Sequence, residues 1–196
     1  MNLNFRDELP PTPFATGTKP AGIRLSPRLI LVIGGGLVAI LIGFFLISLT
    51  SSGGLSPQLQ RLSARLDALQ EMITQSKKSI SDPDLSKLSS DLSILTAGSI
   101  AQLQTPLKNA GMGSISDDIK KAEADEATLQ KLEEAKLAGI FDRTYARLLK
   151  LKLDTLLVLM NDIYDETKSG ALKNALSGVY KDFGTIRKQL DEDINV

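Results

Sequence analysis

The chain has 196 residues, enough for one domain of ordinary size and a membrane anchor. Its 23 basic and 23 acidic residues balance, which predicts no attraction to nucleic acid. It contains no Cys, His or Trp, so thiol nucleophiles, disulfides, imidazole bases and the commonest zinc ligands are excluded. We therefore expect a protein that is not an enzyme and that holds no cofactor.

The N-terminal part of the chain consists of a tail and a long apolar segment. Residues 1–28 are rich in proline and in small and polar residues, a composition that buries too little apolar surface to fold, so we expect a disordered cytoplasmic tail. Residues 29–49 consist only of Leu, Ile, Val, Phe, Gly, Ala and Ser. As a helix, this segment is about 31 Å long and matches a hydrocarbon core of about 30 Å. It predicts a single transmembrane helix in a lipid bilayer.

The residues that flank this segment indicate its processing and orientation. A cleaved signal peptide is the alternative, but its apolar region normally has about 7 to 15 residues and ends in a small-x-small site, which has no clear counterpart here. Lys19, Arg24 and Arg28 precede the segment, and only Arg61 and Arg65 follow it within a comparable distance. Because positive residues stay in the cytoplasm, we expect an uncleaved signal anchor at the cell membrane, with a cytoplasmic N-terminus and an extracytoplasmic C-terminal domain.

Small residues recur on one face of the predicted span. Gly35, Ala39 and Gly43 are spaced by four residues, so they share a face on which two helices can approach closely. Such a face favours a homo-oligomer in the membrane. The alternative is that these residues reflect only the high frequency of glycine in membrane helices.

Beyond a linker predicted at residues 50–55, the apolar residues of segment 56–196 follow a helical spacing. The first helix is predicted to start at Ser56, which precedes a proline. Its buried stripe contains Leu59, Leu62, Leu66, Leu69 and Ile73. After a break at residues 81–83, the next stripe contains Leu85, Leu88, Leu92, Leu95, Ile100 and Leu103. Pro106 is expected to bend or end this second helix.

Three further helices are predicted. The third starts after Ser116, has two aspartates in its first turn, and buries Ile119, Ala122, Leu129 and Leu132. The fourth buries Tyr145, Leu149, Leu156, Met160 and Ile163. The last, after a break at Ser169 and Gly170, buries Leu172, Leu176, Val179, Phe183, Ile186 and Leu190. Because no segment beyond the span alternates with a period of two, we predict an all-α, up-and-down helical bundle.

Two short sequences in the C-terminal part of the chain carry a family resemblance. They are Gly139-Ile140-Phe141-Asp142-Arg143-Thr144-Tyr145, before a long helix, and Ile186-Arg187-Lys188-Gln189-Leu190, near the end of the last helix. With these sequences, the stretch from Leu129 to Leu190 resembles a bacterial family of ferritin-like helical bundles of unknown function, often described as outer membrane or secreted proteins. The resemblance implies a ferritin-like fold more than an activity.

The chain departs from this family in one respect. Family members often carry His on these helices, at positions where this chain has Leu153 or a neighbour and Gln189. From the residues alone, Asp142 is expected to cap the helix that follows, and Phe141 to anchor the junction in the core.

The missing histidines also bear on metal binding, because ferritin-like bundles that bind two metals use Glu-x-x-His pairs. Without histidine this site cannot be built. An all-carboxylate site from residues such as Glu134, Asp154 and Asp162 would need inward-facing side chains, whereas their neighbours in the sequence place most of them outward. We therefore expect no metal site.

The leading hypothesis is a non-enzymatic, membrane-anchored bundle that binds another protein or a component of the cell envelope outside the cytoplasm. A first alternative is a sensory or ligand-binding bundle that signals through a partner, since the N-terminal tail is too short for an output domain. A second alternative takes the stripe from Leu59 to Ile73 as a coiled-coil stalk in an envelope assembly.

Overall fold

The structure of the chain is a computed structural model that describes residues 54–194. The predicted tail, the predicted span and nearly all of the predicted linker lie outside these residues, and so do Gly35, Ala39 and Gly43. Of the helices within residues 54–194, none combines the length and the apolarity that crossing a bilayer requires.

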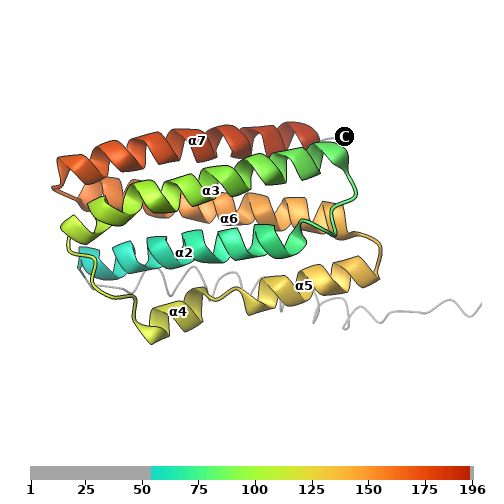
Figure 1. Cartoon of the computed structure of the whole chain (residues 1–196), viewed down its shortest axis with the longest axis horizontal. Coiled ribbons are helices and arrows are strands. Elements are labelled where there is room, and N and C mark those ends of the chain that lie inside the picture. The colour runs from blue at the N-terminus through green and yellow to red at the C-terminus, as the bar shows by residue number, and fades with distance from the viewer. Residues whose placement is uncertain (1–53, 195–196) are drawn as a thin grey trace, which may run out of the picture. The chain divides into compact units, whose positions relative to one another are not determined.

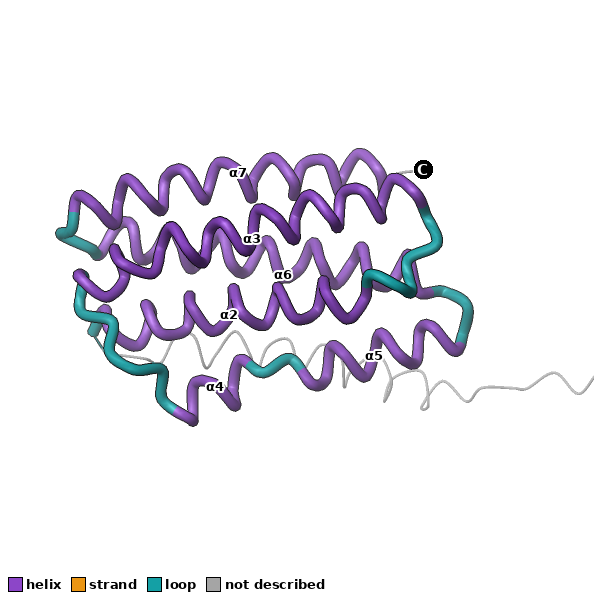
Figure 2. Tube along the Cα trace, viewed as in Figure 1, coloured by secondary structure: helices purple, strands orange, loops and turns teal. Residues whose placement is uncertain are grey.

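The described residues form helices joined by loops (Figure 1), and they contain no strand (Figure 2). The helices are α2 (Leu55–Ser76), α3 (Pro83–Asn109), α4 (Asp117–Glu123), α5 (Glu126–Leu137), α6 (Phe141–Glu166) and α7 (Gly170–Ile194). This arrangement confirms the predicted all-α class for this part of the chain.

Helices α2, α3, α6 and α7 lie side by side as a four-helix bundle (Figure 1). Around the bundle, α2 packs on α3, α3 on α7, α7 on α6, and α6 on α2. Each of these pairs is antiparallel, because α2 and α7 run in one direction and α3 and α6 in the other. Amphipathic helices in this arrangement bury their apolar stripes against one another.

The connection from α3 to α6 lies outside the four helices. Since α3 and α6 run in the same direction, the chain has to return along the bundle between them, and α4 and α5 form this return (Figure 1). Helix α4 packs on α2, and α5 packs on α6. Successive segments of the chain therefore alternate in direction, as predicted. The third segment, formed by α4 and α5, covers the outside of the bundle and does not belong to its core.

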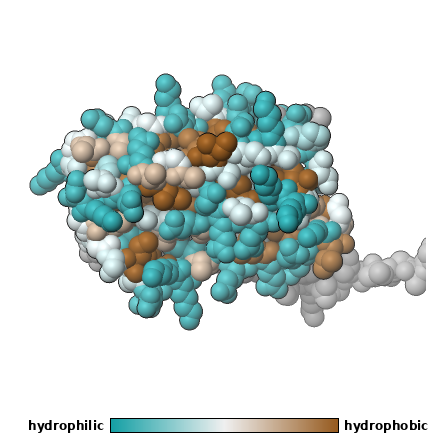
Figure 3. Space-filling view, in the orientation of Figure 1, coloured by the Kyte–Doolittle hydropathy of each residue, from teal (hydrophilic) through white to brown (hydrophobic). Residues whose placement is uncertain are grey.

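The predicted stripes form the core. In α2, α6 and α7 every residue predicted to face inward is buried, apart from the half-buried Ile186. In α3, Leu95 and Ile100 are half-buried at the edge of the core, and the other predicted residues are buried. On the face that Figure 3 shows, apolar groups are small and scattered among polar side chains. That face therefore exposes no extended apolar patch.

The third predicted helix is divided into two. The chain is extended at Ala124, with φ −62° and ψ 119°, and this residue separates α4 from α5. Of the residues predicted to face inward, Leu132 is buried, Leu129 and Ile119 are half-buried, and Ala122 is exposed. The prediction of one continuous helix was wrong, but its predicted start is confirmed, since Ser116 Oγ caps α4 by accepting from the N–H of Ile119. With one Ile and one Ala, α4 has too little apolar area to pack into the core.

Two predicted helix boundaries also differ. Helix α2 begins at Leu55 without a side-chain cap, so Ser56 does not cap it. Pro106 does not end α3, which continues to Asn109. Proline removes a single backbone donor, and here the interrupted turn is already close to the end of the helix. The turn that follows contains Gly111 with φ +96°, a conformation that favours glycine.

A candidate protein-binding groove between two helices

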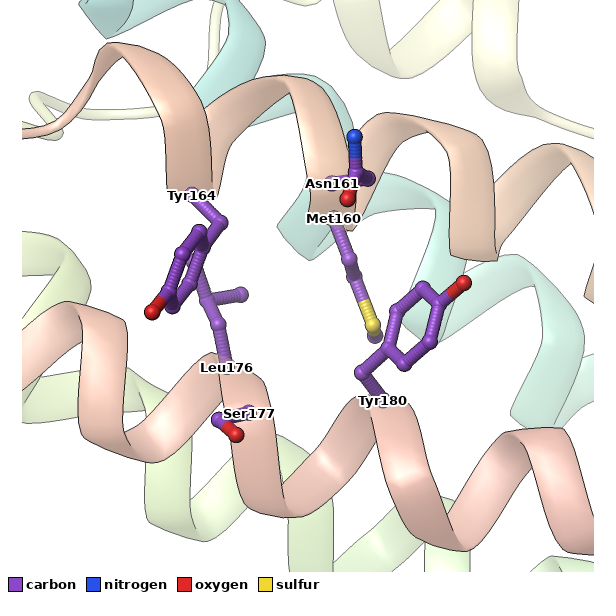
Figure 4. A pocket seen from close by; sticks show the side chains of 6 residues that line it. All are labelled: Met160, Asn161, Tyr164, Leu176, Ser177 and Tyr180. Atoms are coloured by element: carbon purple, nitrogen blue, oxygen red, sulfur yellow. The ribbon is translucent and has the colours of Figure 1, made fainter.

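A groove follows the outer surface between α6 and α7, and one part of it is a hollow of about 170 Å³ (Figure 4). The hollow is lined by Met160, Asn161 and Tyr164 of α6 and by Leu176, Ser177 and Tyr180 of α7. An apolar cavity of about 150 Å³ accommodates a benzene-sized group, whereas ligand pockets usually have at least about 300 Å³. The hollow therefore has room for about one side chain.

The helical repeat explains why two tyrosines line the hollow. Ile163 and Val179 belong to the buried stripes of α6 and α7, and a tyrosine follows each of them directly. At 3.6 residues per turn, each tyrosine lies about 100° further round its helix, at the edge of the buried face. Tyr164 is therefore 39% exposed and Tyr180 is 44% exposed. Figure 4 shows both rings in the space between the helices, with Met160 beside the ring of Tyr180.

The hollow has an apolar floor and a polar rim. Met160 and Leu176 are buried beneath it. The hydroxyl groups of both tyrosines make no hydrogen bond to any part of the chain that the structure describes. At one end, Lys173 Nζ lies 4.8 Å from the centroid of the Tyr164 ring, a cation–π contact. A partner can thus bury apolar surface on the floor and form hydrogen bonds at the rim.

The groove widens into a second, shallower depression of about 580 Å³. The depression shares Asn161 and Tyr180 with the hollow, so the two are continuous. Its other lining residues are Asp154, Leu157, Val158, Asp162 and Arg187.

A cluster of ion pairs joins α6 to α7 at the far end of this depression. Arg187 Nε donates to Asp154 Oδ1 at 2.7 Å, and Arg187 and Lys150 both form ion pairs with Asp191. The hydrogen bond to Asp154 raises the pKa of Arg187, and the hydrogen bond from Lys150 lowers the pKa of Asp191. Because two positive and two negative groups are paired, this cluster has no unbalanced charge to offer a ligand.

Asp162 is not part of this cluster. Its side chain is exposed, and within residues 54–194 it has no hydrogen-bond or ion-pair partner. The nearby Asp165, in contrast, accepts a hydrogen bond from Asn161 Nδ2 at 3.2 Å. The α6 side of the groove therefore presents an unpaired negative charge.

The residues of the family-like motif lie at the opposite end of α6 and form a structural junction. Gly139 follows α5 with φ +70°, which again favours glycine. Phe141 is the first residue of α6 and is buried, as predicted. Its ring stacks on that of Tyr145, with centroids 5.9 Å apart. This stacking fixes the start of α6 on the core.

Asp142 does not cap its own helix, and that prediction was wrong. No side chain caps α6. The Asp142 carboxylate instead accepts hydrogen bonds from the backbone N–H groups of Ser81 at 3.1 Å and Asp82 at 2.9 Å. Asp82 in turn caps α3 by accepting from the N–H groups of Asp84 and Leu85. The carboxylate therefore satisfies donors before α3, across 60 positions of sequence.

Tyr145 supports the same junction from inside the core. Its side chain is fully buried, and its hydroxyl shares a 2.8 Å hydrogen bond with Ser89 Oγ of α3. Burial raises the pKa of Tyr145 to about 12. The hydroxyl therefore stays protonated at neutral pH, and the bond ties α6 to α3.

Other residues singled out from the sequence are not brought together. Leu153 is fully buried and Gln189 is exposed, so the two positions do not form a common site. Glu134 and Asp162 are exposed, and Asp154 is paired with Arg187. In the part of the chain that the structure describes, no group of three or more acidic side chains is arranged to hold a metal ion.

Comparisons of the chain with protein-family models, curated proteins and solved structures found no match. The ferritin-like resemblance therefore stays an interpretation of the sequence.

The sequence analysis did not single out Tyr164 or Tyr180. A signal was present, because each tyrosine directly follows a residue of a predicted buried stripe. The spacing did not reveal that the two edges face each other, since this depends on which helices become neighbours.

Proposed function

We propose that the chain is a non-enzymatic protein that acts by binding a protein partner through the groove between α6 and α7. The observation that carries this proposal is the pair of half-exposed rings, Tyr164 and Tyr180, above an apolar floor. Tyrosine is enriched in protein interfaces because its ring is buried on binding while its hydroxyl finds a partner at the rim. Both hydroxyls are free for this purpose within residues 54–194.

We further propose that residues 29–49 anchor this bundle in the cell membrane and hold it outside the cytoplasm. The apolar composition of the segment and the positive residues before it support this proposal. The single crossover between α3 and α6 supports a ferritin-like fold, because ferritin-like bundles have one long crossover. Protease added to intact cells, once any outer barrier is open, is expected to digest the bundle. Full protection would contradict the topology.

Protein binding can be tested by photo-crosslinking with the full-length chain in native membranes. A photoreactive phenylalanine analogue replaces Tyr180, and in a control chain it replaces Glu71, which is exposed on α2. We expect a discrete protein adduct from position 180 and none of the same size from position 71. The absence of a protein adduct at position 180, or equal adducts at both positions, would contradict the proposal.

A further inference from the structure

The face around the groove carries an excess of exposed apolar side chains. Seven large apolar side chains are exposed within residues 54–194, and four of them lie on α6 and α7. These four are Leu151, Val158, Tyr164 and Tyr180. Contact with another protein would remove this apolar area from water.

The two sides of the groove carry opposite charge. On the α6 side, Asp162 and Asp165 are exposed, and on the α7 side Lys181 and Lys188 are exposed. Asp162 and both lysine ammonium groups have no ion-pair partner among the described residues. The groove thus separates an acidic edge from a basic edge.

These charges lie at matching levels along the bundle. Tyr180 and Asp162 line the same depression, so Lys181, which follows Tyr180, lies at the level of Asp162. In the same way Lys188, which follows Arg187, lies at the level of Asp154, the partner of Arg187. The acidic edge and the basic edge therefore meet at one level of the groove, that of Asp162 and Lys181.

A face with this pattern is complementary to itself. A two-fold rotation about an axis parallel to the helices places α6 of one copy opposite α7 of the other, and the reverse. This rotation keeps every residue at its own level, so Asp162 of each copy faces Lys181 of the other. The facing helices are antiparallel, because α6 and α7 run in opposite directions. The first residues of α2 in the two copies also lie at the same end of the dimer, as anchoring of both chains in one membrane requires.

We infer that the partner in the groove is a second copy of this chain, bound face to face through α6 and α7; this inference rests on the proposed function. The tyrosine rings and Val158 form the apolar centre of the contact, and Asp162 pairs with Lys181 on both flanks. A two-fold axis uses each contact twice, so one substitution changes two contacts in the dimer.

The test uses charge reversal in the full-length chain in native membranes, with two differently tagged copies and the photoreactive residue at position 180. Asp162→Lys alone or Lys181→Glu alone places like charges opposite each other twice, and we expect the yield of the doubly tagged adduct to fall about tenfold. A cell that makes one Asp162→Lys copy and one Lys181→Glu copy restores both contacts, so the adduct is expected to return. The matched controls, Asp91→Lys and Lys87→Glu on the exposed face of α3, are expected to leave the yield unchanged.

The outcomes separate this inference from the proposed function. An adduct that contains a different protein overturns self-pairing and leaves protein binding in place. A doubly tagged adduct that the reversals do not weaken, or that the mixed cell does not restore, overturns the face-to-face arrangement. No protein adduct at all overturns both proposals.

Discussion

Helices α4 and α6 both cover α2, but different forces hold them there. Helix α6 buries nine side chains, most of them large and apolar, whereas α4 buries none. Helix α4 is held by polar contacts, chiefly the ion pair of 2.9 Å between Arg65 Nε and Glu123 Oε2. At its two ends, Ser116 N–H donates to Gln60, and Lys152 pairs with Asp125 at 2.7 Å.

This difference predicts two kinds of opening. Apolar burial is strong in sum and insensitive to salt, so α6 is expected to open only when the whole bundle unfolds. The Arg65–Glu123 pair is partly buried, with side chains that are 19% and 9% exposed, but α4 buries no apolar side chain, so α4 is expected to open locally.

The largest expected effect is the loss of a core side chain from α6. Leu149 is fully buried, and Leu149→Ala removes apolar contacts and leaves a cavity, which is expected to lower the free energy of unfolding by about 3 kcal/mol. Leu137→Ala is the matched control, because Leu137 is 89% exposed, and it is expected to change stability by less than about 0.5 kcal/mol. Urea titration of the full-length chain, followed by circular dichroism, measures both. Equal effects would mean that α6 is not the tightly packed helix described above.

A smaller effect is expected from the buried hydrogen bond of α6. Tyr145→Phe leaves Ser89 Oγ buried without this partner and is expected to lower the free energy of unfolding by about 1 to 2 kcal/mol. Adding Ser89→Ala to this variant removes the unpaired Ser89 hydroxyl. This second substitution is expected to recover part of the lost free energy of unfolding. If Tyr145→Phe is as stable as the original chain, the bond does not stabilise the junction.

The same tyrosine gives the bundle a pH dependence at alkaline pH. Its pKa rises from 10.0 in the unfolded chain to about 12 in the bundle, because burial disfavours the phenolate. The stability that the protonated hydroxyl contributes is complete below pH 10 and is lost as the pH rises through 12. The stability difference between the original chain and Tyr145→Phe is therefore expected to shrink over this range. Taking this difference cancels the contributions to stability that the two chains share.

The same contrast explains which features the sequence could predict. The stripe of α6 was predictable, because large apolar residues at a spacing of three and four identify a buried face. The start of α4 was also predictable, from Ser116 and the two aspartates that follow it, but its lack of buried residues was not. Ile119 and Ala122 follow the same spacing, and spacing does not measure apolar area. The contact of Asp142 with Ser81 and the meeting of Tyr164 with Tyr180 depend on which elements become neighbours, and this information is absent from a local pattern.

The smallest effect on global stability is expected at α4, where it is also the most local. Glu123→Gln removes the charge that Arg65 contacts and keeps the size of the side chain. We expect a loss of about 1 kcal/mol or less in global stability, together with faster amide hydrogen exchange across residues 117–123 and unchanged exchange across α6. Raising the salt concentration is expected to speed exchange at α4 in the original chain and to have little effect in the variant. Lys120→Ala is the control, because the pair between Lys120 and Asp117 is exposed and lies within α4, so its loss does not release α4 from α2. If Glu123→Gln accelerates exchange in α4 and α6 alike, α4 unfolds together with the core. The ion pair then contributes to the global stability of the bundle.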